Sequence, residues 1–243
     1  MSARFRGGTS FFKPLWIASV LALALIMAAE GAGAANGAAS GGAPSSGPGL
    51  TDDARLAELD RTARDVLRLG EEGNLEQALG LVGVMGRQLR ELPWMERTSL
   101  EGAEGLIRSV VELKALLTAV RPNPSEIRRA AVRVRLATDA LLVREEPMWK
   151  QYEAGMRQEL DRLRQAVRAG DERAVRERYG TLAAQAQLIR PAALISGREG
   201  EMNRVQSVLA ALRGKIEDRL LSPAGLEPLL EEASAALKSL FAY

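Results

Sequence analysis

Apolar residues recur every three or four positions from Thr51 to the end of the chain, and this spacing constrains the fold more than any other feature. No stretch of this region alternates apolar and polar residues in the way of a half-buried strand. The first apolar stripe, for example, contains Leu56, Leu59, Ala63 and Val66. The pattern predicts an all-α fold in which each amphipathic helix buries one face.

Capping residues, glycines and prolines divide this region into about eight predicted helices. Thr51, Asn74 and Ser125 are the predicted N-caps of the first, second and fourth helices. We expect helices at about 51–70, 74–92, 98–119, 126–144, 148–169, 171–189, 198–220 and from 222 onward. Pro191 is expected to end the sixth helix, and Pro228 to delay the regular start of the last one. The predicted architecture is an antiparallel helical bundle, with two stacked helical-hairpin units as the alternative.

A weak internal sequence repeat supports the alternative of two stacked helical-hairpin units. Glu-Leu-Asp-Arg at 58–61 recurs at 159–162, and Ser-Val-Val at 109–111 resembles Ser-Val-Leu at 207–209, so both offsets are about 100 residues. Because helical sequences use few residue types, short matches also arise by chance, so duplication and chance both remain as explanations of the repeat. The segment 68–79 resembles a tetratricopeptide hairpin. Because the period of that repeat family is about 34 residues, we favour an isolated hairpin within a bundle over a solenoid.

Residues 1–34 have the features of an export signal. Its basic residues are Arg4, Arg6 and Lys13. They precede an apolar run over residues 15–29, and Ala-Gly-Ala at 32–34 matches an A-x-A cleavage site. The apolar run is shorter than the about 20 residues of a spanning helix. We therefore predict a cleaved signal peptide, with an uncleaved N-terminal membrane anchor as the alternative.

A flexible linker and an electrically neutral domain follow the signal. Residues 35–50 consist of Gly, Ala, Ser, Pro and one Asn before Leu50, which predicts a tether. Residues 51–243 form the predicted extracytoplasmic domain. Of the chain's 33 Lys and Arg and 31 Asp and Glu, three basic residues and one acidic residue precede this domain, which leaves 30 of each. The basic excess lies in the signal, so the charge gives no argument for nucleic-acid binding.

The chain contains no cysteine and no histidine, and this excludes several kinds of site. Disulfides, thiolate zinc sites, iron–sulfur clusters and histidine-dependent catalytic triads cannot form. The acidic pairs at 71–72, 145–146 and 231–232 are adjacent in sequence, so the two side chains of each pair leave a helix in different directions. We therefore predict no enzyme activity, no metal and no cofactor. The alternative is an enzyme that uses two carboxyl groups in a cleft.

Four arginines crowd the fourth predicted helix. Arg128, Arg129, Arg133 and Arg135 follow a single acid, Glu126, and Arg129 and Arg133 lie one helical turn apart. They are candidate contacts for a protein partner or an anionic envelope component. The alternative is a solvated face paired with acids on neighbouring helices.

The few aromatic residues supply further candidate contacts. Trp94, Trp149 and Tyr152 are selected because Trp and Tyr are enriched at interface hot spots. Trp149 and Tyr152 follow Pro147 and lie three residues apart, so they share a face; the alternative is a core anchor at a helix start. Trp94 follows Pro93 and is expected in an exposed loop.

Three glycines on the second predicted helix, Gly80, Gly83 and Gly86, are spaced three apart. Each costs about 1 kcal/mol relative to Ala in an exposed helix. We expect them to allow close helix–helix packing. The alternative is a slot for a partner helix, and a pocket on this face would favour a ligand-binding protein.

Short motifs in the middle of the chain resemble a known family. They are Thr-Ser-Leu-Glu-Gly at 98–102, Arg-Leu-Ala-Thr-Asp-Ala-Leu at 135–141 and Pro-Met-Trp-Lys-Gln-Tyr at 147–152. Together with the signal and the hairpin at Gly73, they resemble the sporulation protein YpjB family of endospore-forming bacteria. The resemblance implies an extracytoplasmic, membrane-associated helical protein tied to spore formation. It also implies a second hydrophobic segment near the C-terminus, but the last predicted helix is too charged for one, so we expect any anchor to be N-terminal.

These inferences combine into one functional prediction. We expect a non-catalytic protein at the outer face of the cytoplasmic membrane, or secreted after signal cleavage, that binds an unknown protein or an envelope component. An extracytoplasmic helical module that binds a small molecule or a lipid is the alternative. No nucleic acid is expected as a partner, because residues 51–243 carry equal numbers of basic and acidic residues.

Overall fold

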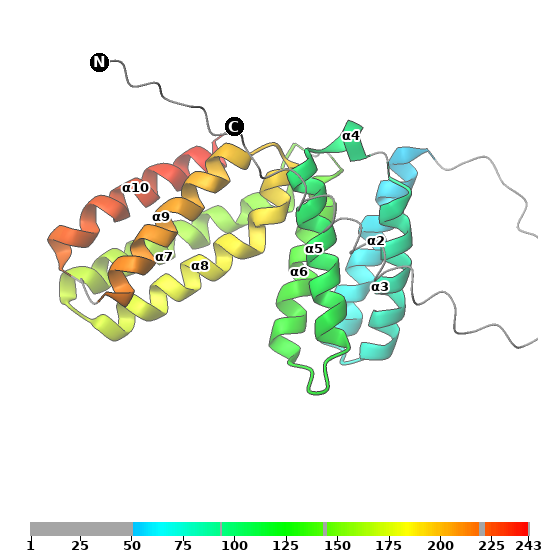
Figure 1. Ribbon diagram of the computed structural model, residues 1–243, viewed down its shortest axis with the longest axis horizontal. Helices are drawn as coiled ribbons and strands as arrows, with labels where there is room; N and C mark the ends of the chain where they lie inside the picture. The colour runs from blue at the N-terminus through cyan, green and yellow to red at the C-terminus, as the bar shows by residue number, and fades with distance from the viewer. Residues whose placement is uncertain (1–50, 93, 143–144, 219–221, 243) are drawn as a thin grey trace, which may run out of the picture. The chain divides into compact units, whose positions relative to one another are not determined.

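The computed structural model describes residues 51–92, 94–142, 145–218 and 222–242, and every regular element in these ranges is a helix (Figure 1). The elements are α2 (Asp52–Glu71), α3 (Leu75–Arg90), α4 (Trp94–Arg97), α5 (Leu100–Leu117), α6 (Pro124–Ala140), η2 (Met148–Tyr152), α7 (Glu153–Ala169), α8 (Glu172–Ile195), α9 (Glu199–Glu217) and α10 (Pro223–Phe241). The all-α prediction is confirmed. The predicted signal and linker fall on residues 1–50, which lie outside the described residues.

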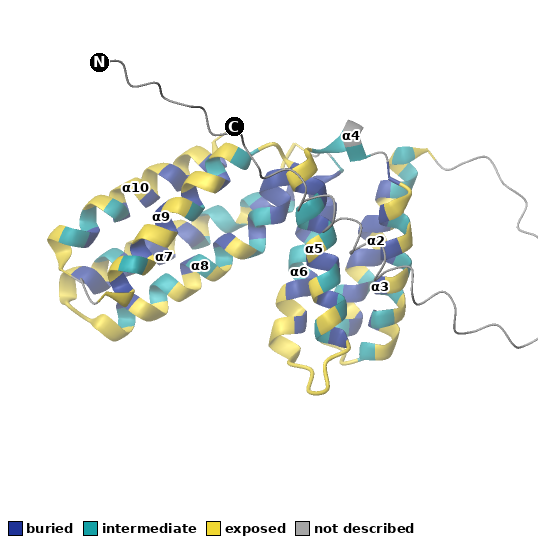
Figure 2. Ribbon diagram, viewed as in Figure 1, coloured by how far each residue is buried: buried dark blue, intermediate teal, exposed yellow. Residues whose placement is uncertain are grey.

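Across the described residues, the long helices pack in two sets of four. In the first set, α2 contacts α3 and α6, and α5 contacts α3 and α6. In the second set, α8 contacts α7 and α9, and α10 contacts α7 and α9. Helix α8 also packs against α5 and α6, so it belongs to both neighbourhoods (Figure 1). The buried positions follow the helix faces that point toward these neighbours (Figure 2).

Two of the three predicted N-caps are confirmed. The side chains of Thr51 and Asn74 each accept a hydrogen bond from the backbone N–H three residues on, at 3.4 Å. Ser125 is not a cap, because Asn123 takes that role and accepts a hydrogen bond from the Ser125 N–H at 3.0 Å. Pro124 then occupies the first helical position, where its fixed φ suits the helix and its missing N–H has no intrahelical partner to lose.

Both prolines that were expected to limit helices lie inside them. Helix α8 continues through Pro191 to Ile195, and α10 begins at Pro223 and continues through Pro228. All residues from Pro191 to Ile195 are buried, so this last turn of α8 gains core contacts that offset the lost hydrogen bond. The fifth predicted helix also differs, because it starts as the 3₁₀ turn η2 before α7 begins.

Two glycines on α5 determine how closely it approaches α8. A Cβ atom at Gly102 would lie 3.1 Å from the Cα of Ile195, and a Cβ at Gly105 would lie 3.6 Å from the Cα of Pro191. These distances leave no room for a larger side chain at Gly102. The crossing places the C-terminal part of α8 directly against α5 and so sets the position of the groove described below.

By length and hydropathy, no helix in the described part of the chain could span a membrane.

Candidate functional site

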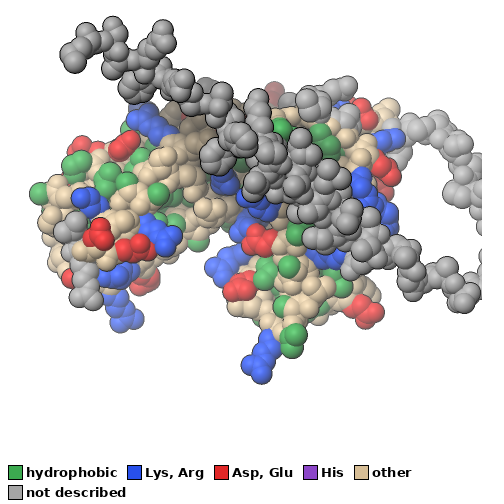
Figure 3. All heavy atoms as spheres, viewed as in Figure 1, with side chains coloured by type: hydrophobic (Ala, Val, Ile, Leu, Met, Phe, Trp, Pro, Cys, Tyr) green, Lys and Arg blue, Asp and Glu red, His purple; other side chains and the backbone are tan. Residues whose placement is uncertain are grey.

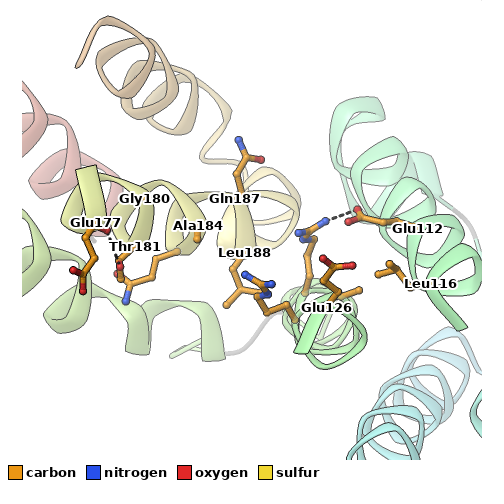
Figure 4. Close-up of a pocket in the computed structure, with 13 residues that line it drawn as sticks. Glu112, Leu116, Glu126, Glu177, Gly180, Thr181, Ala184, Gln187 and Leu188 are labelled. Atoms are coloured by element: carbon orange, nitrogen blue, oxygen red, sulfur yellow. Dashed lines mark hydrogen bonds and ion pairs between the residues drawn. The ribbon is translucent and has the colours of Figure 1, made fainter. Parts of the chain in front are cut away.

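A groove of about 640 Å³ opens between α5, α6 and α8 (Figure 4). Its α5 and α6 walls consist of Glu112, Leu116, Glu126, Arg129, Ala130 and Arg133. Its α8 wall consists of Glu177, Gly180, Thr181, Ala184, Gln185, Gln187 and Leu188. Two of the predicted contact residues, Arg129 and Arg133, therefore line one concave surface, as expected for residues one turn apart.

Small residues on α8 create the open side of the groove. Gly180, Thr181 and Ala184 are exposed, and a Cβ atom at Gly180 would meet no atom within 4 Å. Gly180, Ala184 and Leu188 are spaced four apart and so form one row along the helix. This row was not among the predicted contacts. The spacing of its members could have identified one face of the helix, but not that α5 and α6 lie beside that face.

The charges of the groove are partly paired. The Arg133 guanidinium forms an ion pair with Glu112 of α5, and its side chain is only 22% exposed. Arg129 is exposed, and its Nε donates to the Ser125 carbonyl at 3.3 Å. Glu177 lies at the end of the α8 wall that is farthest from Glu112 (Figure 4). The groove thus combines one ion pair, Arg133–Glu112, with the further charged residues Glu126, Arg129 and Glu177.

The four arginines of α6 do not form one surface. Successive residues on an α-helix are rotated by about 100°, which separates Arg128 and Arg135 from the other two. Arg128 points toward α2, where its Nε lies 3.1 Å from a carboxylate oxygen of Glu71. Arg135 is half-buried, and its Nε has no hydrogen-bond partner among the described residues. Arg128 and Arg135 therefore lie outside the groove, and the pairing of Arg128 with Glu71 agrees with the alternative of a solvated face paired with acids on neighbouring helices.

Trp149 lies in the core and is not a surface contact. None of its side chain is exposed. Its Nε1 donates to the hydroxyl of Ser196 at 3.0 Å, and its ring centroid lies 5.4 Å from that of Phe241. The backbone N–H of the preceding residue, Met148, donates to a carboxylate oxygen of the buried Asp139 at 2.7 Å. The prediction of a partner contact is wrong for Trp149, and the alternative of a core anchor describes it.

Trp94 and Tyr152 are both half-buried. Trp94 begins the short helix α4 rather than lying in a loop, and its Nε1 donates to the Leu89 carbonyl at 2.8 Å. Tyr152 ends η2, and burial raises the pKa of its phenol. Both side chains pack against the core, so neither is a free aromatic anchor, although each keeps some exposed surface.

The predicted glycine face on α3 is not a packing surface. Gly80 and Gly83 are exposed, and a Cβ atom at either would meet nothing within 4 Å. Gly86 is buried. The expectation of close helix packing is wrong for the first two, and neither lines the groove. The close glycine contacts occur instead on α5, at Gly102 and Gly105.

The surface charge of the domain is mixed. On the face shown in Figure 3, the basic and acidic side chains that are not covered by grey atoms are interspersed. The mixture agrees with the equal numbers of basic and acidic residues after residue 50. Within the described ranges, no cluster of three or more acidic side chains is arranged to hold a metal ion.

Comparison with known proteins gives one match. The model of the family described as sporulation protein YpjB (SpoYpjB) matches residues 56–243, which covers α2 to α10 except for the first turn of α2. No curated protein and no solved structure matches the chain.

Proposed function

This chain belongs to the sporulation protein YpjB family, and we propose that it acts in sporulation as a non-catalytic, exported protein that binds a protein partner through the α5/α6/α8 groove. The observation that carries the proposal is the groove itself. It is open, it is lined by three helices, and it has polar and charged groups around an apolar floor. These features are typical of binding surfaces.

Export and membrane association are the second part of the proposal. They are supported by the basic residues, the apolar run and the A-x-A site within residues 1–34. The Gly-rich segment at 35–50 would then act as a tether that lets the helical domain reach a partner at the outer face of the membrane. Cell fractionation of sporulating cells tests this part, since the protein should be found in the membrane or the exported fraction and not in the cytoplasmic fraction.

The non-catalytic assignment is supported by composition. The chain offers no thiol and no imidazole, which removes the commonest nucleophile–base pairs. One carboxylate of the groove, that of Glu112, is also occupied by an ion pair with Arg133. The remaining acids at its rim are exposed, and an exposed carboxylate has little of the desolvation that tunes a catalytic acid.

The second candidate function is the binding of a small molecule or a lipid. The volume of the groove, about 640 Å³, lies within the range of ligand pockets. In contrast, the hollow enclosed by Leu182, Val205, Leu209, Ala233 and Leu237 between α8, α9 and α10 holds only about 10 Å³. A lipid chain therefore has no room in that core, and this candidate would have to use the same groove.

Photocrosslinking in sporulating cells tests the proposed function. A photoreactive amino acid at position 129 probes the groove. The same amino acid at positions 94 and 128 probes two other candidates, the half-buried Trp94 and the exposed Arg128. We expect a discrete protein adduct from position 129. The absence of a protein adduct at all three positions, with the protein present in the exported fraction, would contradict the proposal and favour a lipid or small-molecule ligand.

A further inference from the structure

We propose that the α5/α6/α8 groove binds one amphipathic helix of a partner protein, and that this helix carries a net positive charge. The inference rests on the proposed function, because it names the chemistry of the partner that the groove would bind. The length, the shape and the charge of the groove support it.

The length of the groove suits about three turns of helix. Its α8 wall extends from Glu177 to Leu188. At about 1.5 Å per residue, this wall is about 16 Å long. A bound helix of 10 to 12 residues, at about the same rise, would cover it and could place apolar residues at positions i, i+4 and i+7 against the groove.

The shape of the groove suits a helix rather than a thin chain. Gly180 and Ala184 on α8, together with Ala130 on α6, present almost no side chain to the groove. Small residues at such positions let two helix backbones approach closely, as Gly102 and Gly105 do where α5 meets α8. Leu116 and Leu188, on opposite walls, add apolar surface for the side chains of the bound helix.

The rim charges set the sign of the partner. Arg133 and Glu112 form an ion pair, so together they add no net charge to the groove. The remaining ionised groups are Glu126, Arg129 and Glu177, all exposed. Glu177 forms a long ion pair of 3.9 Å with the adjacent Arg178, which is not part of the groove lining. These two acidic residues and one basic residue leave the groove with a net negative charge. This charge favours a partner helix with more basic than acidic residues on the flanks of its apolar face.

A binding assay with defined peptides tests the charge and the shape together. The probe is a labelled helical peptide of about 14 residues, with Leu at i, i+4 and i+7 and Lys on both flanks of the Leu stripe. The control peptide is identical except that it carries Glu in place of Lys. We expect the full-length protein to bind the Lys peptide about fivefold more tightly than the Glu peptide. Fluorescence anisotropy at low salt measures both affinities.

Matched variants assign this binding to the groove. Ala184→Trp should weaken the Lys peptide at least about tenfold, whereas Ala235→Trp, at an exposed alanine of α10, should not. Glu177→Lys should remove the preference for Lys over Glu, and Glu231→Lys on α10 should keep it. Equal binding of the two peptides, or no effect of both groove variants, would overturn the inference. Because both groove residues are exposed, the variants are expected to fold, which circular dichroism checks.

Crosslinking from position 184 in sporulating cells separates this inference from the proposed function. An adduct that maps to a basic amphipathic helix of a protein supports both. An adduct to a lipid, or to an acidic or non-helical protein segment, overturns the inference. Protein adducts from positions 94 or 128 alone overturn the groove as the site but leave a protein-binding function. The absence of any adduct overturns both.

Discussion

The Nε1 of Trp149 donates a hydrogen bond to the hydroxyl of Ser196, 3.0 Å away, and the whole indole is buried. The contact joins η2 to the C-terminal end of α8, where Ser196 is the C-cap. On its other side the indole meets Phe241, the last residue of α10. One side chain therefore holds together three elements that are far apart in the sequence.

Removal of this side chain should destabilise the protein strongly. Trp149→Ala deletes a fully buried aromatic ring, and we expect a loss of about 3–5 kcal/mol in the free energy of unfolding. Ser196→Ala removes only the hydrogen-bond acceptor and should cost about 1–3 kcal/mol. Urea unfolding of the purified protein measures both. Val120→Ala is the control, since Val120 is 99% exposed and its variant should stay within about 0.5 kcal/mol.

Alanine substitutions at two helical glycines should have opposite effects. At Gly102 a Cβ atom would collide with the Thr98 hydroxyl and would lie 3.1 Å from the Ile195 Cα, so Gly102→Ala must displace these neighbours and should cost about 1–3 kcal/mol. At Gly83 a Cβ atom meets nothing within 4 Å, so Gly83→Ala should stabilise the helix by about 0.5–1 kcal/mol. Thermal unfolding distinguishes the two, and a stabilising Gly102→Ala would contradict the close crossing.

The helices themselves could be predicted because their signals are local. The apolar spacing identified each long helix, and the side chains of Thr51 and Asn74 cap helices as expected. The errors arose where tertiary contacts outweigh a local penalty. Pro191 is a helix breaker by its own chemistry, yet it and the four residues after it are buried in the helix.

The candidate site could be predicted only in part, because the groove is formed by helices that are distant in the chain. The spacing of Arg129 and Arg133 placed them on one side of α6, and both line the groove. The pattern carried no information that α8 crosses this side of α6, so Ala184 and its neighbours were missed. The sequence also could not decide whether Trp149 is buried, because the same aromatic residue types occur in core anchors and in interface hot spots.

The backbone N–H of Met148 should lose its protection when Asp139 is changed. Asp139 is 1% exposed and accepts from this N–H at 2.7 Å, which fixes the start of η2. Asp139→Ala leaves the donor without that acceptor and should cost about 1–3 kcal/mol. Hydrogen exchange should show faster exchange at Met148 and no change at Ala174, whose N–H is capped by Asp171. Unchanged protection at Met148 would show that the contact does not hold η2.

Stability should fall at high pH, partly through Tyr179. Burial, more than the nearby charges of Arg213 and Glu217, raises the pKa of Tyr179 above its usual value of 10.0. Above pH 10.0 the unfolded state therefore releases this proton before the native state does, so the native state loses stability as pH rises further. Below that pH the contribution is constant.

Tyr179→Phe isolates this contribution. The variant should be less stable at pH 8 by about 1 kcal/mol, because it lacks the hydrogen bond from the phenol to the Leu209 carbonyl. From about pH 9.5 to 11, around the ordinary tyrosine pKa, its urea midpoint should fall less steeply than that of the wild type. Parallel pH profiles for the two proteins would exclude Tyr179 as a source of the dependence.

Two prolines of α10 should respond differently to the same substitution. Pro228 is exposed and lies inside the helix, so it cannot donate to the Ala224 carbonyl one turn earlier. Pro228→Ala should restore that bond, with a gain of about 3 kcal/mol offset by about 1 kcal/mol from the freer unfolded chain.

Pro223 is the matched control. It is also exposed, but it occupies the first helical position, where no intrahelical partner is lost. Pro223→Ala should therefore leave stability unchanged or lower it by up to about 1 kcal/mol. Urea unfolding should thus show a higher midpoint for Pro228→Ala than for the wild type, and not for Pro223→Ala. If both variants shifted the midpoint equally, α10 would have to begin after Pro228, as its sequence alone had indicated, and Ser222 would no longer be its N-cap.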